Sequence, residues 1–219
     1  MQKATYFKGD NANQKLCSWR EALQENERHW KKLDLQKSAL IVIDMQEYFL
    51  DPMSHAFVPT APEILPNVKH ALRVFREENL PVVFTYFAVE KGEKDPIGNW
   101  WGRSVEEGSR DSKIVDQLVP QDGEILLRKS SYNSFSGTDL KKILESQDVK
   151  QLVITGVLSN LCCETTAREA FDLGMDVFFT MDATAAFTEQ MHLASLLNLS
   201  CGFATPIAVD QIPLRTAIS

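Results

Sequence analysis

Short apolar runs alternate with segments of helical periodicity along most of the chain. The apolar runs are rich in β-branched and aromatic residues and predict strands; they cover residues 39–43, 82–87, 124–127, 151–155, 176–180 and, less clearly, 203–209. Helical segments between them cover residues 61–79, 137–146, 162–173 and 189–199. In the first of these, Ile64, Val68, Leu72 and Phe75 lie four, four and three residues apart, which puts them on one face of a helix.

The order of these elements predicts the fold class. Strands without internal polar alternation are buried on both faces, as in a parallel sheet, and the helices between them cover those faces. Right-handed crossovers then give three layers. We therefore predict an α/β fold: a three-layer α/β/α domain over residues 37–219 with a doubly wound, mostly parallel sheet of about six strands. A chain of 219 residues suits one such domain.

Residues 1–36 precede this pattern and form a polar, charge-rich extension. We expect one helix in it, over residues 18–32. Two large aromatic side chains of this segment, Trp19 and Trp30, are expected to anchor the extension to the domain that follows.

The connection over residues 88–111 is long and rich in glycine and charged residues. Loops of that length in a compact domain are usually lids or binding loops. It holds the adjacent pair Trp100 and Trp101, which we expect to cover a binding site. Arg103 in the same loop is a candidate partner for a substrate carboxylate, although a solvated arginine is the more common arrangement.

Composition excludes several classes of function. The formal net charge is −7 and the isoelectric point is near 5.2, so no basic surplus exists to bind nucleic acid. The longest apolar run, residues 39–43, is far too short to span a membrane, and no secretory signal is visible. The four cysteines have no disulfide-framework spacing. They are most simply the reduced thiols of a cytoplasmic protein.

Polar residues leave the ends of three of the expected strands. Asp44 follows the first strand, Arg128 and Lys129 follow the third, and Cys162 and Cys163 follow the fourth. Ligands of open parallel sheets bind outside the carboxyl ends of the strands. Each position also has a purely structural interpretation, because Asp44 could be a turn residue, Lys129 a solvated cation and the cysteines core hydrophobes.

A cysteine at the start of a helix can have a reactive thiol. Ser159 or Asn160 is a natural N-cap, which would place Cys162 and Cys163 in the first helical turn. Free backbone N–H groups and a nearby cation lower the pKa of a thiol in that place. Successive helix positions point about 100° apart, so at most one of the two cysteines can face the crevice at the strand ends.

Three blocks of the sequence, within residues 37–210, together resemble the isochorismatase-like cysteine hydrolase superfamily. They are the apolar strand ending in Asp44-Met-Gln, Lys129 followed by "SSYNSF", and "GVLSNLCCETTAREA". In the superfamily's third block the nucleophile lies six residues after the glycine and four before the threonine. Counted from Gly156 and Thr166, that position is Cys162, and Cys163 falls on a position usually occupied by a packing residue.

The resemblance implies a set of site residues. The catalytic triad would be Asp44, Lys129 and Cys162. A cis peptide would join Val157 to Leu158, and the backbone amides of Leu158 and Cys162 would form the oxyanion hole. Members of the superfamily are commonly oligomers, so a homo-oligomer, either a dimer or a tetramer, is expected here, with a small molecule as the substrate.

The resemblance also bears on the branch of the superfamily. Nicotinamidases have metal ligands that include an Asp-x-His element after the second strand, where this chain reads "FTYF". We therefore expect no metal and no cofactor, and disfavour nicotinamidase. The stretches "DMQEYFL", "WWG" and "KSSYNSF" look like the isochorismatase branch, but this chain retains Cys162 and has Phe87 where phenazine-pathway relatives place a polar residue.

The sequence thus predicts a hydrolase that cleaves an amide or carbamoyl-type C–N bond through a thioester on Cys162. One alternative is isochorismatase-type hydrolysis of a vinyl ether, with Asp44 as general acid and no covalent intermediate. Another is a catalytically inactive binding protein. The side chains that we expect around the substrate are Tyr48, Phe87, Trp100, Trp101, Arg103, Tyr132 and Phe135.

Overall fold

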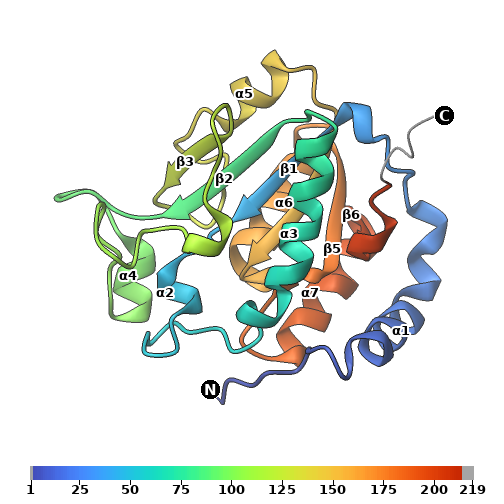
Figure 1. Cartoon of the computed structure of the whole chain (residues 1–219), viewed down its shortest axis with the longest axis horizontal. Coiled ribbons are helices and arrows are strands. Elements are labelled where there is room, and N and C mark those ends of the chain that lie inside the picture. Colours follow the sequence, from blue (N-terminus) through green and yellow to red (C-terminus); the bar gives the residue numbers. More distant parts are fainter. Residues whose placement is uncertain (1, 214–219) are drawn as a thin grey trace.

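A six-stranded parallel sheet forms the centre of the protein (Figure 1) in a computed structural model that describes residues 2–213. In chain order the strands are β1 (Ser38–Ile43), β2 (Val82–Phe87), β3 (Ile125–Lys129), β4 (Gln151–Val157), β5 (Asp176–Ala185) and β6 (Ala204–Ile207). Across the sheet they lie in the order β3-β2-β1-β4-β5-β6, and every neighbouring pair is parallel. The predicted fold class is confirmed. The strand order reverses between β1 and β4, which is where sheets of this type form a ligand crevice.

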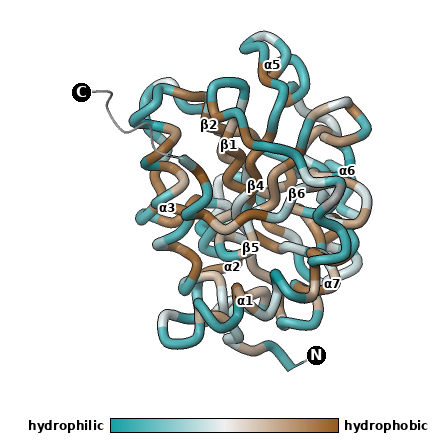
Figure 2. Tube along the Cα trace, turned by 90° about the vertical axis from the view of Figure 1, so that its right-hand side faces the viewer, coloured by the Kyte–Doolittle hydropathy of each residue, from teal (hydrophilic) through white to brown (hydrophobic). Residues whose placement is uncertain are grey.

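Helices cover both faces of the sheet. Figure 2 shows α3 (Ala61–Glu77) on one side of the strands, and α6 (Glu164–Asp172) and α7 (Glu189–Gly202) on the other. The remaining helices are α1 (Ala12–Leu23), α2 (Glu47–Leu50), α4 (Pro96–Trp101) and α5 (Leu140–Ser146). Between the helical layers, all residues of β1 and β4 are buried. Their apolar sequences therefore lack the polar alternation of a sheet that faces water.

The extension at the start of the chain packs on the domain, but its helix is placed differently from the prediction. In the structure α1 covers Ala12–Leu23, and only a 3-10 turn, Gln24–His29, follows. The physical reason is that Trp19 and Leu23, one helical turn apart, are both buried, whereas the polar residues after them have no apolar face to bury. Trp19 Nε1 donates a hydrogen bond to Glu189 Oε1 of α7 at 3.1 Å. The boundary near residue 37 stays a prediction, and the domain's predicted end at 219 lies outside the described residues.

Strand β5 continues five residues past its predicted end at 180. Two polar residues, Asp182 and Thr184, obscured this extension in the sequence. Both are satisfied inside the fold: Asp182 Oδ1 accepts the Val209 N–H at 2.9 Å, and the Thr184 hydroxyl donates to the Thr180 carbonyl at 2.6 Å. Within residues 2–213, none of the helices has both the length and the apolar character needed to cross a lipid bilayer.

Candidate active site

Asp44 lies directly after β1, with its backbone in the left-handed region (φ 51°) and its side chain fully buried. Its carboxylate oxygen Oδ1 accepts the hydroxyl of Thr85 in β2 at 2.8 Å. Gln46 fixes the same corner, because its side chain both accepts from the N–H of Phe87, at 2.7 Å, and donates to the Phe87 carbonyl, at 3.0 Å. The ends of β1 and β2 are thus joined, and the Asp44 carboxylate has one orientation.

Lys129 is the last residue of β3 and is 1% exposed. Its ammonium Nζ lies 2.7 Å from Asp44 Oδ2, 3.3 Å from Cys162 Sγ and 3.0 Å from the Ser131 carbonyl oxygen. The ammonium is therefore ion-paired with the Asp44 carboxylate and donates hydrogen bonds to the Cys162 sulfur and the Ser131 carbonyl. Burial lowers the pKa of Lys129, but Asp44 and Cys162 more than offset this and leave the pKa above its ordinary value. The side chain stays positively charged.

Cys162 belongs to a π-helical turn, Ser159–Cys163, that precedes α6. Neither predicted N-cap, Ser159 or Asn160, caps a helix here: the residue before the turn is Leu158, with extended backbone and no side-chain cap. The Ser159 hydroxyl is instead engaged with the ring of His192 at 2.7 Å. The prediction of an ordinary first α-helical turn was therefore wrong.

The expectation of a lowered thiol pKa was also wrong. Burial, followed by the charge of Asp44, raises the pKa of Cys162 above its usual value, and the opposing effect of Lys129 is smaller. The free thiol is therefore protonated near neutral pH, and its hydrogen bond to the Asp44 carboxylate adds to the shift. Cys163 is fully buried and its pKa is raised mainly by burial. Of the two cysteines, only Cys162 lines the cavity described below.

Gly156 brings the cysteine turn close to Asp44. Gly156 in β4 pairs with Ile43 in β1 and has φ +110°. A Cβ at Gly156 would collide with the Ile43 carbonyl oxygen, so only glycine permits this approach. The peptide between Val157 and Leu158 is cis, as the resemblance implied.

A hydroxyl contact joins α6, which follows the cysteine turn, to the loop after β3. Thr166 Oγ1 accepts the Ser134 N–H at 3.1 Å and donates to Ser134 Oγ at 2.9 Å. The loop that follows Lys129 is thereby held against α6, close to the cysteine turn.

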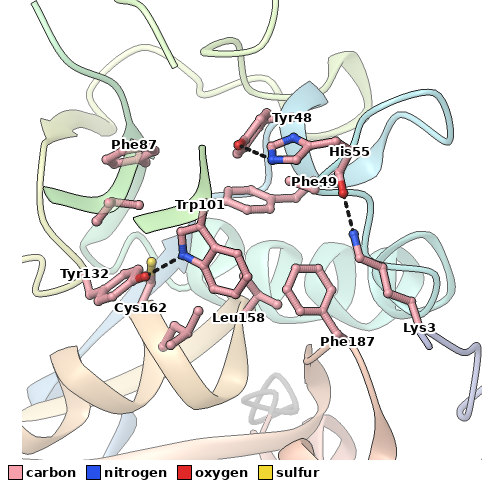
Figure 3. Close-up of a pocket in the computed structure, with 13 residues that line it drawn as sticks. Lys3, Tyr48, Phe49, His55, Phe87, Trp101, Tyr132, Leu158, Cys162 and Phe187 are labelled. Atoms are coloured by element: carbon pink, nitrogen blue, oxygen red, sulfur yellow. Dashed lines mark hydrogen bonds between the residues drawn. The ribbon is translucent and has the colours of Figure 1, made fainter. Parts of the chain in front are cut away.

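A cavity of about 210 Å³ opens above Cys162 (Figure 3). Most of its lining is apolar or aromatic. The residues that line it are Lys3, Tyr48, Phe49, His55, Ala56, Phe87, Ile97, Trp101, Tyr132, Leu158, Leu161, Cys162 and Phe187. In Figure 3, Cys162 lies beside Tyr132 at one end of the cavity and Lys3 lies at the opposite end. A cavity of this character suits a small, flat molecule with little charge.

Four of the predicted substrate-binding residues line this cavity. Tyr48 comes from α2, Phe87 from the end of β2, Trp101 from α4 and Tyr132 from the loop after β3. Trp101 Nε1 donates a hydrogen bond to the Tyr132 hydroxyl oxygen at 2.7 Å. The long connection thus covers the cavity through one of its two tryptophans.

Three other expected residues are not part of the lining, which corrects the prediction for each. Trp100 is 80% exposed, so the second tryptophan of the pair faces solvent. The guanidinium of Arg103 forms an ion pair with Asp111, with 2.6 Å between Nη2 and Oδ2, and is thereby occupied. Phe135 packs against the hydrophobic core instead.

Lys3, His55 and Phe187 line the cavity without having been predicted from the sequence. Lys3 Nζ donates to the backbone carbonyls of His55, at 2.6 Å, and Phe57, at 2.9 Å. It also lies 4.2 Å from the centroid of the Phe187 ring. The only local signals were a lysine in a polar segment and a phenylalanine after an apolar run. The partners are 52 and 184 residues from Lys3 along the chain, so periodicity could not connect them.

No metal cluster is visible in the part of the chain that the structure describes: it contains no group of three or more His, Cys, Asp or Glu side chains able to hold an ion. The expectation that the protein needs no metal stays a prediction.

Several known proteins are similar to this chain in sequence. The model of the isochorismatase domain matches residues 38–211, which is more than half of the chain. The chain belongs to the isochorismatase family of hydrolases. Among curated members of the family, nicotinamidase 3 of Arabidopsis thaliana is 38% identical over 183 residues, covering 80% of this chain and 86% of that protein. The isochorismatase of Bacillus subtilis is 29% identical over 195 residues, covering 87% of this chain but 61% of that longer protein.

Two solved structures have the same fold. A cysteine hydrolase from Pseudomonas syringae pv. phaseolicola has a TM-score of 0.78 at 22% identity and covers 82% of this chain and 92% of its own. N-carbamoylsarcosine amidase from Thermoplasma acidophilum has a TM-score of 0.72 at 27% identity and covers 80% and 97%. The preference for the isochorismatase branch over nicotinamidase gains no support, because the nicotinamidase relative has the higher identity of the two curated proteins.

Proposed function

We propose that the protein hydrolyses the amide or carbamoyl-type C–N bond of a small, largely uncharged molecule through a thioester on Cys162. The observation that carries the proposal is the buried Lys129 ammonium, within 3.3 Å of both the Asp44 carboxylate and the Cys162 sulfur, at one end of an apolar cavity. Relatives named nicotinamidase, N-carbamoylsarcosine amidase and ureidoacrylate amidohydrolase agree with cleavage of a C–N bond.

The first half of the reaction forms the thioester. Asp44 takes the proton of the Cys162 thiol as the sulfur attacks the carbonyl carbon. The carbonyl oxygen becomes an oxyanion, which the backbone amides of Leu158 and Cys162 are proposed to hold. Collapse of this intermediate breaks the C–N bond, Asp44 returns the proton to the leaving nitrogen, and an amine or ammonia departs.

Water completes the cycle. It adds to the thioester carbon while Asp44 accepts a proton, the C–S bond breaks, and the proton returns to sulfur as the acid product leaves. Attack moves one negative charge from Asp44 to the bound oxyanion, while Lys129 stays positive. The number of charges in the site is therefore constant, which suits a buried site that water cannot solvate.

The lining of the cavity argues against isochorismate, which carries two carboxylates. Among the described residues of the lining, the cationic side chain is Lys3, and its ammonium already donates to two backbone carbonyls. Burial and the nearby cations Arg103 and Lys3 lower the pKa of the other candidate, His55, which is therefore neutral near pH 7. Two carboxylates would lose water here without gaining a matching set of cations.

An inactive binding protein has no need of the buried charges. Asp44 and Lys129 are both removed from water, and burying an ion pair brings little net stability compared with apolar residues of the same size. A fold that had lost its chemistry could therefore replace both at no cost. Their presence beside a cavity-lining thiol supports the catalytic interpretation.

A hydrolysis screen tests the proposal. Small aromatic and aliphatic amides, carbamoyl compounds and isochorismate are offered to wild type, Cys162→Ala and Cys163→Ala. We expect turnover of at least one C–N substrate, a loss of more than about a thousandfold in Cys162→Ala, and near-wild-type turnover in the matched control Cys163→Ala. Hydrolysis of isochorismate that persists in Cys162→Ala would instead establish the vinyl-ether route.

A further inference from the structure

His192 lies behind the cysteine turn, on α7, and its side chain is fully buried. Its ring nitrogen Nε2 is 3.0 Å from the Met181 carbonyl oxygen, and Nδ1 is 2.7 Å from the Ser159 hydroxyl oxygen. A carbonyl oxygen only accepts hydrogen bonds, so Nε2 must carry the hydrogen. In a neutral ring Nδ1 is then the acceptor, and the Ser159 hydroxyl donates to it.

The surroundings keep the ring in this single form. Burial lowers the pKa of His192 to about 4. The ring is therefore neutral at any pH near 7, with one tautomer set by Met181. Trp19 and Tyr6, from the segment before the family domain, pack on the ring with centroid distances of 4.7 and 5.6 Å. The imidazole is thus packed against two aromatic rings.

Ser159 lies between the two residues whose backbone amides are proposed to bind the oxyanion. It is the first residue of the turn, after Leu158 and before Cys162. The Leu158 carbonyl is held by the amides of Leu161, at 3.0 Å, and Cys163, at 3.2 Å. The Ser159 carbonyl accepts the Glu164 N–H, so main-chain hydrogen bonds hold the turn from inside. The Ser159 side chain, which is fully buried and bonded to His192, ties the turn to α7.

We propose that His192 is a positioning residue of the reaction: acting through the Ser159 hydroxyl, it holds the 158–162 turn so that the backbone amides and the Cys162 thiol converge on one carbonyl group. This inference rests on the proposed function. His192 is not part of the cavity lining and does not touch substrate, so it is neither an acid nor a base in the reaction. Its contribution is alignment, and displacements of about 1 Å at a reacting centre cost about a hundredfold in rate.

The two ring nitrogens allow this role to be separated from plain packing. His192→Asn leaves an amide oxygen near the position of Nδ1, where it can accept the Ser159 hydroxyl, and gives up the contact with Met181. His192→Gln leaves an amide N–H near the position of Nε2, where it can donate to Met181, and gives up the contact with Ser159. Both remove the same aromatic contacts with Trp19 and Tyr6, so they form a matched pair with similar expected losses of stability.

The experiment compares two reactions of Cys162 in each variant. Acylation by p-nitrophenyl acetate needs the thiol and is accelerated by an oxyanion hole, and it breaks the ester C–O bond with release of p-nitrophenol. Alkylation by iodoacetamide displaces iodide and needs the thiol but no oxyanion hole. The ratio of the two rates therefore reports alignment of the turn and does not depend on which amide is the natural substrate.

We expect His192→Gln and Ser159→Ala to lower this ratio by roughly tenfold to a hundredfold, in line with partial loss of an oxyanion donor. His192→Asn should stay within a few-fold of wild type, and Ser159→Ala combined with His192→Gln should be no worse than either change. Where amide turnover is measurable, kcat should fall with the ratio while KM changes little.

An equal ratio of acylation to alkylation rates in His192→Asn and His192→Gln would overturn the positioning role. Substitutions that lower only thermal stability would do the same, and His192 would then be a structural residue. The role would also be overturned if iodoacetamide alkylates Cys162 in the wild type but p-nitrophenyl acetate does not acylate it, because no oxyanion hole would then exist to align. Failure of the proposed function has a different signature: Cys162 is acylated normally, with the expected differences between variants, but no amide or carbamoyl compound is hydrolysed.

Discussion

The two ends of the cavity are built from different kinds of structure. The Asp–Lys–Cys cluster (Asp44, Lys129 and Cys162) lies at or just beyond the ends of β1, β3 and β4, and all three side chains are 3% exposed or less. The outer wall (Lys3, His55, Trp101 and Phe187) comes from the N-terminal segment, two loops and the short helix α4. Strand ends and a hydrogen bond between neighbouring strands position the first group, whereas side-chain contacts between segments distant in sequence hold the second.

This difference separates chemistry from selection of the substrate. Groups that must stay within a few tenths of an ångström of one another are best held by strand ends that packing has already fixed. Groups that decide which molecule enters can lie on loops, where changes leave the core intact. We therefore expect substitutions in the Asp–Lys–Cys cluster to affect the rate of the chemical step, and those in the outer wall to affect KM.

The largest effect is expected from Lys129→Met, which removes the cation from the Asp–Lys–Cys cluster. The Asp44 carboxylate would then be buried without a partner, so unfolding free energy should fall by about 3–5 kcal/mol. Turnover should fall by more than about a thousandfold. Urea unfolding and steady-state rates measure the two losses.

Two controls accompany this change. Lys142→Met disrupts an exposed ion pair with Asp139 and should leave the unfolding free energy unchanged within experimental error, because solvent screens such pairs. Adding Asp44→Asn to Lys129→Met removes the orphaned charge and should restore part of the lost stability, though none of the activity. If Lys129→Met is as stable as wild type, the buried pair is not arranged as described.

Asp44→Asn should change the reactivity of Cys162 and the turnover in opposite directions. The Asp44 charge raises the pKa of Cys162, so its removal lowers that pKa and increases the thiolate fraction at a given pH. Alkylation by iodoacetamide at pH 8 should become faster, because its rate follows the thiolate fraction. Hydrolysis should nevertheless be lost, because no base remains. Slower alkylation in Asp44→Asn would show that the sign of this interaction is wrong.

The raised pKa of the Cys162 thiol predicts how its alkylation rate in the wild type depends on pH. Because its pKa is raised, the thiolate fraction at pH 7 is below that of a free cysteine, and it should still be increasing above pH 9. Alkylation rates of Cys162 measured from pH 6 to 10 should therefore rise without a plateau. A plateau already reached at pH 7 would mean that the resting enzyme holds a thiolate.

The neighbouring tryptophans give a matched test of the outer wall. Trp101 lines the cavity and bonds to Tyr132, whereas Trp100 is largely exposed. Trp101→Ala should raise KM about tenfold through lost contact area, with kcat changed less. Trp100→Ala should leave both constants within twofold. Equal effects of the two substitutions would remove Trp101 from the binding site.

The smallest effect is expected from Lys3→Met. The lysine joins the N-terminal segment to the backbone around His55 and Phe57, and a part-buried hydrogen bond of this kind contributes about 1–2 kcal/mol. KM should rise three- to tenfold with kcat nearly unchanged. Lys3→Arg should recover part of the loss, and Lys8→Met, at an exposed lysine paired with Asp10, should have no effect. A change in kcat with constant KM would link Lys3 to the chemical step instead.

The same comparison explains what the sequence could and could not predict. Apolar runs without polar alternation identified the strands, and parallel topology required their ends to meet, which placed Asp44, Lys129 and the two neighbouring cysteines at one edge of the sheet. The resemblance of the three sequence blocks to the superfamily then selected Cys162 from the pair. No such rule of topology places the residues of the outer wall. Contacts such as that between Lys3 and Phe187 join segments that share no periodicity. Trp100 and Trp101 are the same residue type side by side, and only the turn of α4 distinguishes them.

Two predictions about the cysteine turn, its helical start and the pKa of its thiol, were wrong for physical reasons. The helix around Cys162 begins differently from the prediction because Ser159 is bonded to His192, 33 residues later, and is not available as a cap. The lowered thiol pKa was expected from the helix start and the nearby lysine, but burial and the Asp44 charge outweigh both. In each case a long-range contact decided the outcome over a local tendency.

Mass spectrometry of Cys162 during turnover tests the central claim most directly. Wild-type protein mixed with a hydrolysed amide is quenched in acid at millisecond intervals, digested, and the peptide containing Cys162 and Cys163 is fragmented. The account predicts the mass of the acyl group on Cys162, formed before the first turnover is complete and absent from Cys163. A protein that hydrolyses the amide at full rate while Cys162 stays unmodified at every interval, and that keeps this rate after Cys162→Ala, would contradict it.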